Sequence, residues 1–171
     1  MRKRIWIAAA ALAAALVFGP QPGKAQNADA LVTYNSMKPE VALQLASDAL
    51  KICRDAGYQV AIAVVDRFGL TQVLLRDQFA GAHTVSTATR KAWTAVSFRT
   101  ATLELSELVA GGPVMAQIPD ITNALVLGGG VPILAGGGLV GGIGISGAPG
   151  ADLDHDCAEK AIENIQDMLD F

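Results

Sequence analysis

Cysteine, histidine and aromatic residues are all scarce in this sequence of 171 residues. There are two cysteines, two histidines and 5% aromatic side chains. Two cysteines without a C-x-x-C motif argue against a dithiol redox centre or a cysteine-based metal site. Long apolar helices are lacking too, because the run Ile5–Phe18 has 14 residues whereas a membrane-spanning helix needs about 20. No other segment resembles a span.

The first 25 residues have the pattern of a cleavable export signal. Basic residues at 2–4 precede the apolar run, a Gly-Pro pair ends it, and small residues lie three and one positions before a cut after Ala25. Cleavage after Ala28 is an alternative. We therefore expect residues 1–25 to be a signal peptide, the protein to be periplasmic or secreted, and no membrane insertion after cleavage.

The chain that remains after residue 25 has fewer basic than acidic side chains. The segment 1–25 holds four of the 13 basic residues and none of the 16 acidic ones, which leaves nine against 16. Nucleic-acid binders need a basic face, so this charge balance excludes nucleic acid as a partner. We expect residues 26–36 to form a flexible arm and residues 37–171 to form a single domain.

The two cysteines favour a structural disulfide. Export places Cys53 and Cys157 where disulfides form, and the alternative is two free buried thiols. In the chain-entropy model a bridge closing a loop of about 100 residues stabilises the fold by ~4 to 5 kcal/mol.

Hydrophobic periodicity predicts an α/β fold. Two β-branched runs separated by Asp66–Gly69 predict a β-hairpin, and both are apolar on both faces, so helices are expected to cover each face of the sheet. Of the 18 glycines, 11 lie between Gly128 and Gly150, around three more short apolar runs. The predicted strands are 58–65, 70–76, 124–127, 131–135 and 139–146, and the predicted helices are 39–57, 86–99, 102–109 and 152–169.

Two motifs that suggest chemistry lack the required context. The glycines at 136, 138 and 141 match G-x-G-x-x-G, but a strand rather than a helix follows them, which excludes a dinucleotide fingerprint. Ser146 lies between glycines without the G-x-S-x-G elbow of serine hydrolases. A hydroxyl bonded to neighbouring backbone is the simpler interpretation of Ser146.

The clearest ligand candidate is His83, between a predicted strand and a predicted helix. A neutral imidazole at such a loop can ligate a metal, and the alternative is a polar residue that caps the helix. Arg90 and Lys91 follow on that helix, where they could meet carboxylates of a bound molecule or form an ordinary surface. Glu104 and Glu107, spaced E-x-x-E on the next helix, could hold an iron ion or simply be solvated.

Five stretches of this chain resemble the GlcG/HbpS family, which includes the C-terminal domain of PduO-type proteins. They are VAIAVVDRFG at 60–69, LRDQFAGAH at 75–83, ATRKAWTA at 88–95, GGGVPI at 128–133 and VGGIGISGAPG at 140–150. They occur in order and span nearly the whole chain after the signal.

The resemblance implies a five-stranded antiparallel sheet flanked by helices on both faces, with profilin-like layering, in a homo-oligomer. Some members bind heme, and one exported branch is tied to heme and iron sensing. The resemblance thus implies heme as the cofactor, with His83 as axial ligand, Arg90 and Lys91 neutralising propionates, and glycine-rich strands admitting a flat ligand. Glu104 and Glu107 look like the iron motif of the exported branch.

An enzyme or accessory protein acting on a small organic acid such as glycolate is the alternative function, suggested by relatives linked to glycolate operons. In that case Arg76, Arg90 or Lys91 would bind a carboxylate, and His83 would act as acid or base. Arg76 is therefore a further ligand-binding candidate. An oligomeric scaffold that binds nothing tightly is a third possibility.

Overall fold

The computed structural model describes residues 30–169, so the predicted signal peptide lies outside the described residues. Residues from Tyr34 onwards belong to one compact unit, and residues 30–33 belong to a separate N-terminal unit. In residues 30–169 there is no helix with the length and apolar character to cross a membrane. The elements in chain order are α1 (Pro39–Asp55), β1 (Ala61–Asp66), β2 (Thr71–Arg76), α2 (Thr84–Phe98), α3 (Thr102–Ala110), a 3-10 helix η2 (Ile118–Asp120), β3 (Gly130–Ala135), β4 (Gly138–Ser146), α4 (Ala151–Glu163) and α5 (Gln166–Leu169).

Within residues 30–169 the sheet has four strands, in the order β2-β1-β4-β3, and every neighbouring pair is antiparallel. The predicted α/β class and antiparallel sheet are confirmed, whereas the prediction of five strands is wrong. Residues 124–127 are not in the sheet because side chains of α2 and α3 take their backbone groups. The Leu125 N–H donates to Thr94 Oγ1 at 2.9 Å, and the Leu127 carbonyl accepts from Thr102 Oγ1 at 2.7 Å.

The predicted hairpin between β1 and β2 is confirmed. Asp66 Oδ1 accepts the N–H groups of Phe68 and Leu70 at 2.8 and 3.0 Å, which is the local hydrogen bonding that favours Asp in turns. Gly69 has φ +83°, a conformation that few side chains tolerate. This hairpin contacts the residues just before α1, since Tyr34 packs edge-on against Phe68 with 5.0 Å between ring centroids.

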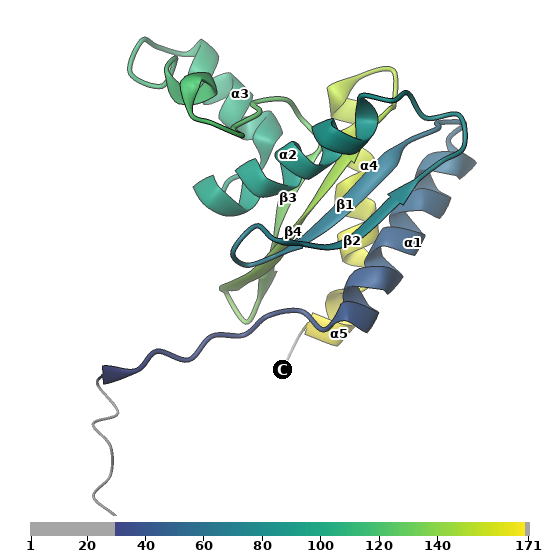
Figure 1. The fold of residues 1–171 in the computed structure, drawn as a ribbon, viewed down its shortest axis with the longest axis horizontal. Helices are drawn as coiled ribbons and strands as arrows, with labels where there is room; N and C mark the ends of the chain where they lie inside the picture. Colours follow the sequence, from purple (N-terminus) through teal and green to yellow (C-terminus); the bar gives the residue numbers. More distant parts are fainter. Residues whose placement is uncertain (1–29, 170–171) are drawn as a thin grey trace, which may run out of the picture. The chain divides into compact units, whose positions relative to one another are not determined.

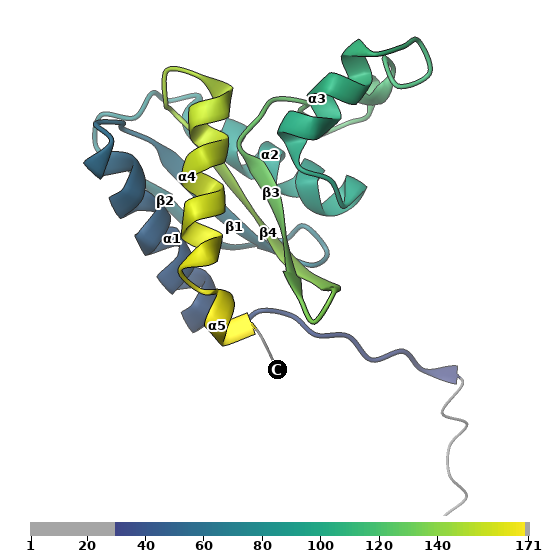
Figure 2. The same cartoon turned by 180° about the vertical axis from the view of Figure 1, so that it is seen from behind.

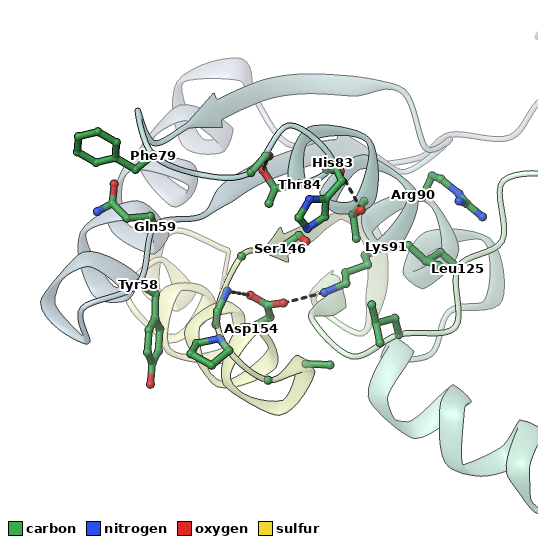
Figure 3. Close-up of a pocket in the computed structure, with 18 of the residues that line it drawn as sticks. Tyr58, Gln59, Phe79, His83, Thr84, Arg90, Lys91, Leu125, Ser146 and Asp154 are labelled. Carbon is green, nitrogen blue, oxygen red and sulfur yellow. Dashed lines mark hydrogen bonds and ion pairs between the residues drawn. The ribbon is translucent and has the colours of Figure 1, made fainter.

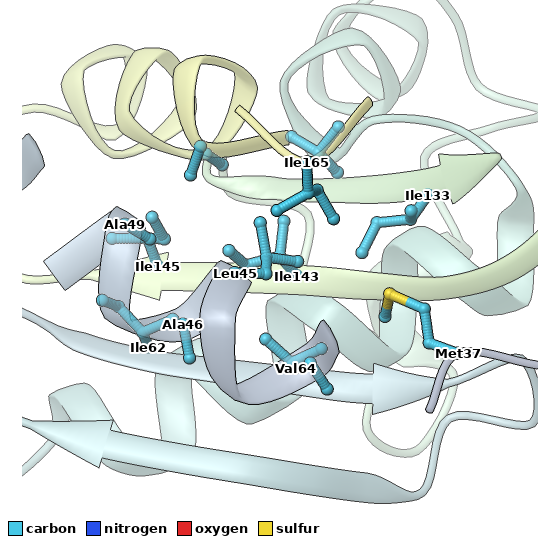
Figure 4. Close-up of a cluster of buried hydrophobic side chains, with 14 of the residues drawn as sticks. Met37, Leu45, Ala46, Ala49, Ile62, Val64, Ile133, Ile143, Ile145 and Ile165 are labelled. Carbon is cyan, nitrogen blue, oxygen red and sulfur yellow. The ribbon is translucent and has the colours of Figure 1, made fainter. Parts of the chain in front are cut away.

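Helices α1 and α4 cover one face of the sheet and α2 covers the other, which gives three layers (Figures 1 and 2). The face of the sheet toward α1 and α4 carries large apolar side chains from alternate strand positions, because alternate residues of a strand point to the same face. The fully buried ones are Ile62, Val64, Ile133, Ile143 and Ile145. Figure 4 shows them in one cluster with side chains of α1.

The α2 face is built from small residues. Ala61 and Ala63 on β1 pack against Ala88 and Ala92 of α2. A side chain at Gly144 of β4 would overlap the carbonyl oxygen of Ala88. The expectation that the strand glycines leave room for a flat ligand is therefore wrong at Gly130, Gly142 and Gly144, because residues of helix α2 occupy that space.

The predicted disulfide is confirmed. It joins Cys53 of α1 to Cys157 of α4, with 5.8 Å between the two Cα atoms. Both residues are buried in the core between these helices and the sheet. The bridge therefore links the two helices of one layer across 104 residues of sequence.

Candidate functional site

A pocket of about 720 Å³ opens at one end of the sheet. Its size falls within the roughly 300–1,000 Å³ typical of small-molecule sites. Its walls come from the loop before β1, the loop between β2 and α2, the first turns of α2, and the segment that joins β4 to α4 (Figure 3). The side chains that define it are Tyr58, Gln59, Phe79, His83, Thr84, Thr87, Arg90, Lys91, Leu125, Leu127, Ser146, Pro149 and Asp154.

His83 lines this pocket at the residue immediately before α2, as the sequence predicts for a strand-to-helix junction. Its carbonyl oxygen accepts hydrogen bonds from the side chains of Ser86 and Thr87 at 3.1 and 2.9 Å. The backbone is thereby fixed, while no side chain or backbone group in residues 30–169 hydrogen-bonds to the imidazole. The imidazole packs over Gly81, where a Cβ atom would lie 2.8 Å from Cε1. The His83 side chain is thus exposed and faces the pocket, and its ring nitrogens are free of hydrogen bonds within the described residues, so one of them could bind a metal.

Lys91 is completely buried at the floor of the pocket, and this overturns its predicted role as a free cation for propionates. Its ammonium donates to Asp154 Oδ2 at 2.8 Å and to the Ile145 carbonyl at 2.9 Å. The sequence places Lys91 on the stripe of small residues of α2, and that stripe faces the sheet. The charge of Lys91 is therefore matched inside the protein before any ligand binds.

Asp154 ties the Lys91 pair to the wall between β4 and α4. Its second carboxylate oxygen, Oδ1, accepts the Ala148 N–H at 3.0 Å. Burial raises the pKa of Asp154 and lowers the pKa of Lys91, because an apolar environment disfavours both charged forms, and their mutual attraction opposes both shifts. The ion pair consequently joins three parts of the pocket wall, namely α2, the end of β4 and the start of α4.

The two predicted arginines lie in different places. Arg90 lines the pocket at its edge, where its guanidinium donates to the Ala124 carbonyl at 2.8 Å and points away from the pocket centre in Figure 3. Arg76 is not among the residues that line the pocket. It donates to the Ala80 carbonyl at 2.7 Å and so braces the loop that leads to His83. Of the two, only Arg90 lines the pocket.

Glu104 and Glu107 are exposed on α3 and do not line the pocket. In the described part of the chain no group of three or more histidine, cysteine or acidic side chains is arranged to hold a metal ion. The structure therefore does not bring this pair together with His83, and an iron ion on Glu104 and Glu107 stays a prediction.

Sequence reasoning missed the burial of Asp154 and the place of Phe79 and Ser146 in the pocket. Asp154 was not among the predicted ligand-binding residues. Its spacing of three, four and seven residues from Cys157, Ala158 and Ala161 puts it on the buried face of α4. That spacing is a signal that the sequence contains, whereas nothing local distinguishes Phe79 or Ser146.

Comparison with known proteins places this chain in a family. The model of the family described as "Haem degrading protein HbpS-like" matches residues 37–163. The chain belongs to the HbpS-like family. This confirms the resemblance inferred from the five sequence stretches.

Two solved structures and one curated protein illustrate the relationship. A double glutamate-to-aspartate variant of HbpS from Streptomyces reticuli is 36% identical, with 92% of this chain and 98% of that chain covered and a TM-score of 0.75. The PduOC:heme complex is 32% identical, with 75% and 94% covered and a TM-score of 0.69. The corrinoid adenosyltransferase PduO of Salmonella typhimurium is 35% identical over 124 residues, which are 71% of this chain and 37% of that protein. The chain thus spans little more than a third of PduO.

Proposed function

We propose that this protein binds heme in the pocket beside His83, with the imidazole of His83 as axial ligand. The observation that carries the proposal is an imidazole that faces a pocket of about 720 Å³ and has no hydrogen-bond partner in residues 30–169. The HbpS-like relative PduOC, which has the same fold, is described as a heme complex. Neutral imidazole is a common ligand of heme iron.

The remaining lining fits a flat, largely apolar group with acidic substituents. Phe79 is 78% exposed and Leu127 is 42% exposed, so both present apolar surface to a ligand. Arg90 lies at the edge of the pocket, and a propionate at that edge would meet its guanidinium once the side chain turns from the Ala124 carbonyl. Bound heme would supply an iron centre for ligand exchange or electron transfer, and the protein would supply the ligand nitrogen and the apolar cover.

Titration of the protein with hemin tests this proposal. We expect a saturable shift of the Soret band, and we expect His83→Ala to abolish the shift or weaken binding by at least tenfold. His155→Gln is the matched control, because His155 is the second of the two histidines and does not line the pocket. Binding that is unchanged in His83→Ala would refute axial ligation by this residue.

We also propose that the protein works outside the cytoplasm, in heme or iron sensing or storage. The support is the signal-peptide pattern of residues 1–25 together with the Cys53–Cys157 disulfide, since disulfides persist in oxidising compartments. Fractionation of cells that express the full chain should recover the processed protein from the periplasm or medium. Recovery of unprocessed protein from the cytoplasm would contradict it.

Self-association is a further part of the proposal. Strand β2 is an edge of the four-stranded sheet, and exposed apolar side chains lie along it and its turn: Phe68 at 58%, Leu70 at 68% and Leu74 at 43%. Exposed edges and apolar patches are features of interaction surfaces. Light scattering after size exclusion should give a mass that is a multiple of the chain mass, and a monomer at micromolar concentration would contradict this.

A further inference from the structure

Ser146, the last residue of β4, carries a hydroxyl that is left without a partner. The residue is 5% exposed and lines the pocket. No donor or acceptor in residues 30–169 hydrogen-bonds to this hydroxyl. The wholly enclosed unpaired polar side-chain atoms in that part of the chain belong to Gln72, Asp77 and His155. The Ser146 hydroxyl is therefore not sealed off, and the space that it faces is the pocket (Figure 3).

The neighbouring polar groups are already committed to one another. Lys91 bonds to Asp154 and to the carbonyl of Ile145, the residue before Ser146. The other oxygen of Asp154 bonds to the Ala148 N–H. A nearly buried hydroxyl prefers a hydrogen-bond partner to none, and a ligand in the pocket is the group in position to supply one.

The charge of the pocket wall indicates the chemistry of that partner. Among the described residues of the lining, Lys91 and Asp154 neutralise each other in their ion pair, which leaves Arg90 at the edge of the pocket as the cation without an acidic partner. Asp152, beside the lining residue Ala151, is exposed to solvent as Arg90 is, so solvent screens both charges. The floor of the pocket is thus neutral, and the unmatched cation at its edge favours an anionic group on a ligand that reaches from Ser146 to that edge.

We propose that Ser146 recognises a carboxylate of the ligand by donating a hydrogen bond from its hydroxyl. This inference rests on the proposed function when the carboxylate is a heme propionate. A free carboxylic acid would offer the same acceptor, so the experiment includes both sources.

The test compares protoporphyrin IX with its dimethyl ester, which lacks both carboxylates. Neither contains iron, so binding does not depend on axial ligation, and quenching of Trp93 fluorescence reports it. Wild-type protein should bind the acid about 10- to 100-fold more tightly than the ester, as expected for a hydrogen bond to a charged group. Ser146→Ala should lose most of that preference while its affinity for the ester stays the same. Ser47→Ala, a change on the exposed side of α1, should behave as wild type.

The ratio of the two affinities separates recognition from general damage, because a misfolded variant weakens acid and ester equally. The inference is overturned if wild type binds both porphyrins alike, or if Ser146→Ala weakens both by the same factor. A thermal-shift series with glycolate and acetate covers the second source. If these acids stabilise wild type but not Ser146→Ala, and neither porphyrin nor hemin binds, Ser146 is supported as the carboxylate contact and the heme proposal is removed. No binding of any probe by wild type overturns both.

Discussion

Removing the Lys91 ammonium is expected to destabilise the protein strongly. The side chains of Lys91 and Asp154 are 1% and 5% exposed, and their charged atoms are 2.8 Å apart. In Lys91→Met the Asp154 carboxylate stays buried with no counter-charge, and the Ile145 carbonyl loses its donor. Breaking a buried ion pair in this way costs about 3 to 5 kcal/mol of unfolding free energy. Because domains are typically stable by only about 5 to 15 kcal/mol, this is a large share of the total.

A double-mutant cycle isolates the contribution of the pair. Asp154→Asn alone leaves the ammonium unmatched and should also cost about 3 to 5 kcal/mol. In the double variant Lys91→Met/Asp154→Asn no charge remains, and the Asn oxygen can still accept the Ala148 N–H. We therefore expect the double variant to lose only about 1 to 3 kcal/mol, chiefly from the unpaired Ile145 carbonyl.

Urea unfolding followed by circular dichroism supplies the four free energies. The singles should each exceed the double variant in cost, which gives a coupling of several kcal/mol. Additive costs, or a loss below about 1 kcal/mol in either single variant, would show that the two charges do not depend on one another. Such a result would refute the assignment of Lys91 and Asp154 as a buried ion pair.

Three further tests concern a tightly packed glycine, the disulfide and a buried hydroxyl. Gly144→Ala should lower the melting temperature by several degrees or prevent folding, because the new Cβ would overlap a carbonyl of α2. Gly112 has open space around it, so the control Gly112→Ala should keep the melting temperature within about 2 °C of wild type. Replacing Cys53 and Cys157 together by Ser should lower the unfolding free energy by up to ~4 to 5 kcal/mol, and reductant should then have no effect on urea midpoints. Thr102→Val should cost about 1 to 3 kcal/mol in urea melts by stranding the backbone groups that its hydroxyl bonds at 2.7 and 2.8 Å.

The sequence predicts most of the fold because hydrophobic period and turn residues act locally. The hairpin at Asp66–Gly69 follows from Asx and glycine chemistry, and helices α1 and α2 follow from apolar spacing. The segment 124–127 could not be predicted correctly, because its composition suits a strand and only the tertiary contacts with Thr94 and Thr102 decide its partners. Side-chain hydroxyls that satisfy backbone groups leave no local pattern in a sequence.

The candidate site was predicted only in part, because local patterns identify some of its residues and tertiary contacts decide the others. His83 was identified because a strand-to-helix junction is recognisable from both flanking elements. Lys91 was assigned to the ligand although its spacing from Ala88 and Ala95 puts it on the buried face of α2. Its partner Asp154 lies 63 residues away along the chain, and no local rule connects the two.

Resonance Raman spectroscopy of the reduced, hemin-loaded protein tests the central proposal most directly, because it detects the bond between iron and an imidazole nitrogen. With ¹⁵N-labelled histidine, an iron–nitrogen stretching band should shift to lower frequency in wild type and in His155→Gln, and it should be missing from His83→Ala. A labelled band that survives in His83→Ala, or no isotope-sensitive band in wild type, would contradict ligation by His83.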